Sequence, residues 1–176
     1  AITAACGREA NLLTTTDYNV AIESIASGKA QMALLGPEGY VQANKKNPKV
    51  LAAFTNSDED GGLDGACYYS RICVRTEDAD AYKSGSGYSI EGIKGGSFSF
   101  VSATSTSGFK GPASGIVTEF GLDSSDELLE GGKFFSEGLF GNSHVGSLVN
   151  LLSGDADAAA FDDVDVDMYL DLVSGE

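Results

Sequence analysis

Apolar residues fall along the chain in two kinds of run. Some runs repeat every three to four residues behind a polar cap, as Val20, Ile22 and Ile25 do after Asp17, and predict helices. Others are short and nearly continuous, and predict buried strands. We expect helices over residues 1–6, 17–26, 38–46 and 143–152, and strands or extended segments over residues 9–16, 31–35, 50–54, 67–74, 97–101, 133–140 and 158–161.

The alternation of strands and helices predicts an α/β fold with mainly parallel sheets. In such sheets, ligands bind beyond the carboxyl ends of the strands, where the next helices begin. A weak internal repeat supports two similar units, because residues 17–35 and 143–161 share a polar cap, a ring-bearing residue, an apolar helix, Ser-Gly and an apolar run. Tyr18 and His144 hold equivalent places in it, at the starts of the two helices.

Charge narrows the class of partner. The chain has 26 acidic and 11 basic residues, with a net charge of −15, and therefore repels nucleic acid and anionic lipid. An anionic ligand would have to be held by local N–H and hydroxyl donors. No metal or cofactor is expected, since the three cysteines lack metal-ligand spacing and neither a P-loop nor a GxGxxG motif is present.

The strongest local signal is Ser105-Thr106-Ser107-Gly108, between an expected strand and an amphipathic stretch that continues to residue 120. N–H groups in the first turn of a helix lack internal partners, and the helix dipole favours negative charge there. Three neighbouring hydroxyls would add donors suited to a tetrahedral oxyanion. The alternative is a polar turn in which a serine only caps the helix.

His144 is the only histidine of the chain. Beside a helix start it could donate to an oxyanion, or it could be a cap-region residue without function. A hydrolytic triad of Ser105, His144 and Asp162 is a third possibility, but the sequence lacks the GxSxG motif of such enzymes. We therefore expect no enzymatic activity.

Four segments together resemble the phosphonate, phosphite and phosphate substrate-binding proteins of ABC transporters, which have the type 2 periplasmic-binding fold. They are TDYNVAIESIASGKAQMALLGPEGY (16–40), CYYSRICVR (67–75), FSFVSATSTSGF (98–109) and GNSHVGSLVNLLSGDADAAA (141–160). They follow the family's order and spacing and span nearly the whole chain. The resemblance implies a two-lobed protein, incomplete here at both ends, with residues 1–74 in lobe 1, residues 75–176 in lobe 2 and a hinge near residues 69–75.

The resemblance also implies ligand-binding roles for particular residues. Those matched to the oxyanion contacts of the family are Tyr18, Tyr68, Ser105, Thr106, Ser107 and His144. Many phosphonate binders also place a carboxylate after the last strand, to pair with a substrate amine. In ungapped register this place falls on Val164, with Asp162 and Asp163 nearby, and Asp162 is the candidate that we retain.

The same resemblance implies the biological setting. The protein would be extracytoplasmic, in the periplasm or at the cell surface, where it would act as a monomer that delivers its ligand to an ABC transporter permease. The segment TAACG at residues 3–7 is similar to a lipoprotein processing site, although Gly7 also fits the end of a short helix. A binding protein of the same fold for another small ligand, such as a thiamine precursor, is the alternative function.

Overall fold

The computed structural model describes residues 2–58 and 60–174. A four-stranded sheet forms in the order β1-β6-β4-β5, in which β4 runs parallel to β5 and β6, and β1 runs antiparallel to β6. The strands are β1 (Ser70–Val74), β4 (Ser97–Phe100), β5 (Glu137–Phe140) and β6 (Ala158–Asp162). This mixed, mostly parallel sheet confirms the α/β class expected from the sequence.

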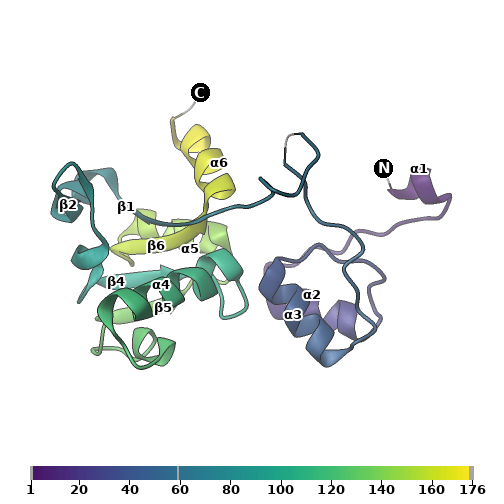
Figure 1. Cartoon of the computed structure of the whole chain (residues 1–176), viewed down its shortest axis with the longest axis horizontal. Helices are drawn as coiled ribbons and strands as arrows, with labels where there is room; N and C mark the ends of the chain where they lie inside the picture. The colour runs from purple at the N-terminus through teal and green to yellow at the C-terminus, as the bar shows by residue number, and fades with distance from the viewer. Residues whose placement is uncertain (1, 59, 175–176) are drawn as a thin grey trace.

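Three helices follow strands of this sheet, as the alternating pattern predicted (Figure 1). They are α4 (Gly111–Phe120), α5 (His144–Ser153) and α6 (Asp163–Ser174). Short 3-10 turns lie at Thr76–Tyr82, Ile90–Ile93 and Ser125–Leu128, and a small hairpin joins β2 (Lys83–Ser84) to β3 (Gly87–Tyr88). We call residues 70–174 the sheet region.

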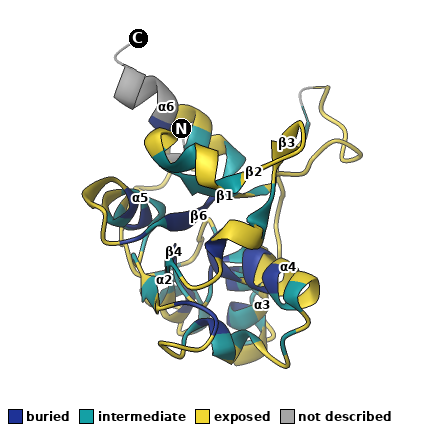
Figure 2. Ribbon diagram, turned by 90° about the vertical axis from the view of Figure 1, so that its left-hand side faces the viewer, coloured by how far each residue is buried: buried dark blue, intermediate teal, exposed yellow. Residues whose placement is uncertain are grey.

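A phenylalanine cluster fills the sheet region. Phe98 and Phe100 project from β4 into this core, and their rings lie 4.5 Å apart. Phe135 stacks on Phe98 at 4.9 Å, and Phe109 meets Phe100 edge-on at 5.1 Å. Figure 2 shows the buried residues gathered in β6 and along the inner side of α4. This core fixes the carboxyl ends of the strands, from which the candidate site is built.

The first region, residues 2–69, differs from the sequence-based expectation. It contains α1 (Ile2–Cys6), α2 (Tyr18–Ala26) and α3 (Pro37–Lys46), and α2 packs on α3. Figure 1 shows this helix pair beside the sheet region, joined to it by a long connecting segment. The left-handed Gly7 ends α1, as expected.

The strands expected over residues 9–16, 31–35 and 50–54 do not form, so that prediction was wrong. Leu12, Leu34 and Leu51 lie in these segments and are 87%, 88% and 75% exposed. A strand requires a neighbour for its N–H and C=O groups, and the described residues place no strand beside these segments. Both copies of the internal repeat therefore form a helix, α2 in the first and α5 in the second, but only the second copy ends in a strand.

Other boundaries moved by a few residues. The expected strand over residues 67–74 is confined to Ser70–Val74, and the extended segment over 133–140 pairs only at Glu137–Phe140. The helices at 17–26, 38–46 and 143–152 are confirmed to within one residue. Polar caps account for this accuracy, because the Asp17 and Ser143 side chains accept hydrogen bonds from the first turns of α2 and α5.

Candidate functional site

The turn at residues 105–108 lies just past the carboxyl end of β4. The Ser105 hydroxyl accepts a hydrogen bond from Gly108 N at 3.1 Å, and a π-helical turn over Thr106–Lys110 leads into α4. Gly108 is required here, because a Cβ atom at this position would lie 2.3 Å from the Cβ of Val101. The glycine thus lets the turn fold back on the end of β4.

Donors remain available in this turn. Among the described residues, no acceptor meets the backbone N–H groups of Thr106 or Ser107. Ser105 is 2% exposed, and Ser107 is also buried, its carbonyl accepting a 2.6 Å hydrogen bond from the Ser70 hydroxyl. Two unused N–H groups beside buried hydroxyls form the kind of helix start that binds anions.

Residues of the first region meet the 105–108 turn from the other side. Glu38 N, in the first turn of α3, donates to the Thr106 hydroxyl oxygen at 2.9 Å. Tyr68 comes to the same place, since the Thr106 hydroxyl and the Tyr68 phenol oxygen both lie within 4 Å of the position of a Cβ atom on Gly36. Tyr68 and Thr106, far apart in the sequence, therefore share one neighbourhood.

Tyr18 completes this group at the first residue of α2. Burial raises the pKa of its phenol, a hydrogen bond with Ser105 opposes the rise, and the carboxylates of Asp165 and Asp162 add to it. The phenol is thus neutral at pH 7 and can donate. Four predicted residues, Tyr18, Tyr68, Ser105 and Thr106, are accordingly brought together by the fold.

His144 begins α5, behind the Ser143 cap that accepts from Gly146 N at 3.0 Å. Its side chain is 11% exposed and faces two carboxylates. Nε2 lies 3.6 Å from Asp162 Oδ2, and Nδ1 lies 3.3 Å from Asp165 Oδ2. Nδ1 is buried and has no hydrogen-bond partner among the described residues.

The three positions considered for a carboxylate after the last strand, Asp162, Asp163 and Val164, have different environments in the structure. Asp162 caps α6 by accepting from Asp165 N at 2.7 Å, whereas Val164 is exposed and Asp163 accepts from Tyr69 N. Burial, followed by the neighbouring Asp162 charge, raises the pKa of Asp165, and His144 opposes the rise. Sequence reasoning missed Asp165, although its place three residues after the strand end returns it to Asp162 once a helix forms.

Tyr169, one turn further along α6, was also missed. Its side chain is buried, and burial together with the charges of Asp165 and Asp162 raises its pKa to about 12. Tyr18 contributes to the same rise. Tyr169 therefore lies near Tyr18 as well as near Asp162 and Asp165.

Comparison with known proteins identifies the class to which this arrangement belongs. Residues 1–174 match the model of a family described as the phosphonate periplasmic substrate-binding protein of ABC transporters. The chain belongs to this family. The family is described as one of substrate-binding proteins, so membership agrees with the expectation of a non-enzymatic protein and argues against a hydrolytic triad of Ser105, His144 and Asp162.

Two individual relatives are similar to most of this chain. The phosphate-import protein PhnD of Mycolicibacterium smegmatis is 28% identical over 160 residues, which cover 89% of this chain and 46% of that protein. A crystal structure of a binding-protein component of an ABC phosphonate transporter from Pseudomonas aeruginosa superposes with a TM-score of 0.73 at 18% identity, over 98% of this chain and 52% of that one. The latter likeness supports the fold. The chain spans about half the length of either relative.

Proposed function

We propose that this chain is the ligand-binding part of an extracytoplasmic solute-binding protein that captures a small phosphorus oxyanion, a phosphonate, phosphite or phosphate, for ABC import. The observation that carries the proposal is the meeting of Tyr18 and Tyr68 with Ser105 and Thr106, from segments far apart in sequence. Tyr18 begins α2, and Ser105 and Thr106 begin the turn that leads into α4, where a helix start favours anions. Tyr68 brings its hydroxyl to the same place from the segment before β1.

The donor set suits a strongly acidic protein. With a net charge of −15 the molecule repels anions at long range, and salt screens this repulsion over about 8–10 Å. Hydrogen bonds from neutral groups to a charged acceptor each contribute about 1.5–3 kcal/mol. Several such bonds at residues 105–107, with the hydroxyls of Tyr18 and Tyr68 beside them, would therefore outweigh the screened repulsion.

The proposal includes a two-lobed arrangement with residues 1–74 in lobe 1, residues 75–176 in lobe 2 and a hinge near residues 69–75. Support comes from the connecting segment that leads from α3 to β1. Since β1 already pairs with β6 from Ser70 onward, the early end of the hinge range is favoured. A ligand that contacts both lobes would favour their closure, because it gains those contacts only in the closed state.

An ABC permease that recognises the closed form is the proposed partner, and a monomer at the outer side of the membrane is the proposed working state. Helices long and apolar enough to cross a bilayer are absent from the described part of the chain. Asp162 is assigned the place where a positively charged group of the ligand would lie, since its Oδ2 atom faces His144 at the edge of the site.

A calorimetric titration of the full chain tests the proposal. Phosphonate, phosphite and phosphate should release binding heat, and sulfate and amino acids should not. Thr106→Val keeps the side-chain volume but removes the hydroxyl, so affinity for the preferred anion should fall about ten- to a hundredfold. Thr118→Val on α4 is the matched control, because the Thr118 hydroxyl bonds only to the Ser114 carbonyl on the helix surface.

Two results would contradict the proposal. Equal affinity of the Thr106→Val and Thr118→Val variants would remove the 105–108 turn from the site. If an aromatic thiamine precursor releases binding heat and no phosphorus oxyanion does, the result would instead favour the alternative function, a binding protein of the same fold for another small ligand.

A further inference from the structure

The carbonyl oxygen of Phe100, at the carboxyl end of β4, accepts two hydrogen bonds from elements on the other side of the sheet region. One comes from Gly141 N at 2.8 Å, just after β5, and the other comes from the Ser147 hydroxyl of α5 at 3.0 Å. The next residue, Val101, donates its N–H group at 3.0 Å to the carbonyl of the last residue of the 105–108 turn. One strand end therefore joins α5 to the 105–108 turn.

We propose that Gly146 and Ser147 are positioning residues for the oxyanion site, because they hold the start of α5 at a fixed place relative to the 105–108 turn. His144 begins this helix and faces Asp162 at the edge of the proposed site, so it moves wherever the helix start moves. This assignment rests on the proposed function. Gly146 and Ser147 would act on the ligand only through the elements that they hold together.

The first turn of α5 lies directly against the connection from β5. A Cβ atom on Gly146 would overlap the carbonyl oxygen of Gly141, and a Cβ atom on Gly141 would overlap the backbone nitrogen of Ser147. Residues 141–143 make the whole connection, in which Asn142 has a left-handed conformation with a φ of 62°. Glycine at both positions therefore permits an approach that any side chain would prevent.

Buried hydroxyl groups fix the same helix on β4. Ser99 and Ser147 are both fully buried, and their hydroxyl oxygens lie 3.3 Å apart. Asn150 Nδ2 donates to the Ser99 hydroxyl at 3.0 Å, about one turn further along α5. Because an unpaired polar group in the core is costly, such a network favours one placement of the helix. The start of α5 is thus held both by backbone contact and by hydrogen bonds.

Gly146→Ala is the sharper test, since the added methyl group should push the start of α5 away from its neighbour. The full chain is titrated by calorimetry with phosphate, phosphite and methylphosphonate. Affinity for whichever anion binds the unmodified chain most tightly should fall about tenfold. The imidazole ¹⁵N resonances of His144, the only histidine, should also shift in the unliganded variant. Gly115→Ala on α4 is the matched control and should change neither measurement, because its methyl group would meet no atom within 4 Å.

Ser147→Ala removes the hydroxyl without adding volume, so the affinity should fall less, by about threefold. Its control is Ile93→Val, which removes a buried methyl group in the turn before β4, at the other end of that strand from Phe100. Both variants should lower the unfolding temperature, but only Ser147→Ala should weaken anion binding. Equal losses of affinity would assign Ser147 to general stability and overturn its positioning role.

The outcomes also separate the positioning role from the proposed function. If the unmodified chain binds one of the three anions and Gly146→Ala binds it equally well, the positioning role is wrong and the proposed function stands. If the unmodified chain binds none of them, both are wrong. If Gly146→Ala does not fold, as judged by circular dichroism, Ser147→Ala must show the loss of affinity.

Discussion

Residues 31–35 and residues 158–161 are both short apolar runs after a Ser-Gly helix end, yet only the second becomes a strand. Ala158, Ala159 and Ala160 are buried between β1 and β4, whereas Leu34 lies open to solvent. The two runs differ in their neighbours more than in their residues. A strand in this molecule therefore depends on the strands that flank it, which a local pattern does not contain.

The same contrast divides the candidate site. Ser105, Thr106 and Ser107 follow a strand that is paired on both sides, and the phenylalanine core fixes their backbone. Tyr18 and Tyr68 come from the first region, where α2 and α3 mainly support each other. The 105–108 turn is thus held by the core of the sheet region, whereas Tyr18 and Tyr68 reach it from outside that core.

The largest expected difference between the regions lies in stability. Phe100→Ala should lower the free energy of unfolding by about 3–5 kcal/mol, because it removes a fully buried ring that neighbours four others. Leu34→Ala should change it by less than about 0.5 kcal/mol. Urea unfolding followed by circular dichroism measures both, and similar losses would show that Leu34 is buried in solution.

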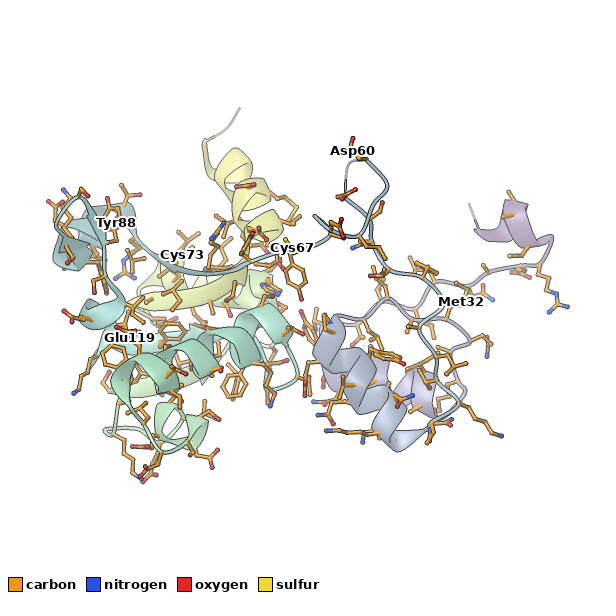
Figure 3. All side chains as sticks on the ribbon, in the orientation of Figure 1. Met32, Asp60, Cys67, Cys73, Tyr88 and Glu119 are labelled. Atoms are coloured by element: carbon orange, nitrogen blue, oxygen red, sulfur yellow. The ribbon has the colours of Figure 1, made fainter. Side chains whose placement is uncertain are left out.

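A smaller effect is expected on ligand binding. Tyr18→Phe removes the phenol hydroxyl that meets Ser105, so affinity for the preferred phosphorus oxyanion should fall about tenfold, with little change in stability. Tyr88→Phe is the control, since Tyr88 lies in the hairpin at the end of the sheet region that faces away from α2 (Figure 3). Unchanged affinity after Tyr18→Phe would remove the first region from the site.

The smallest expected effect concerns Asp157, which accepts hydrogen bonds from Ser97 N at 2.8 Å and from Ser97 Oγ at 2.9 Å. The bond from Ser97 N lowers the pKa of Asp157, burial opposes this, and the Ser97 hydroxyl and Arg75 reinforce it. The unfolded chain then binds more protons than the folded chain in acid. The contribution of Asp157 is therefore present above the unfolded pKa and lost as pH falls through the folded pKa.

Asp157→Ala should accordingly cost about 1 kcal/mol at pH 7, a figure reduced for the half-exposed side chain, and nothing near pH 2. Asp60→Ala, in the exposed loop of the first region labelled in Figure 3, should have no effect at either pH. Thermal unfolding at both pH values measures the difference. A loss that persists in acid would assign the role of Asp157 to packing.

Local chemistry explains what the sequence could predict. Capped helices were placed to within a residue because Asp17 and Ser143 satisfy N–H groups in their own first turns. The same reasoning predicted that Ser105 and His144 lie at helix starts, and the structure places them there. The unpaired segments of the first region could not be recognised, because pairing depends on residues distant in the sequence. Asp165 was missed because its role depends on α6 beginning directly after β6.

The hydrogen bond from Glu38 N to Thr106 joins the two regions through a hydroxyl that also belongs to the proposed site. A hydroxyl that accepts one hydrogen bond keeps its proton for another acceptor, so docking of α3 and capture of an anion can occur together. If the bound anion strengthens the docking of α3 by some factor, docked α3 must strengthen binding of the anion by the same factor. Thr106→Ser would preserve this coupling between α3 docking and anion binding, and Thr106→Val would abolish it.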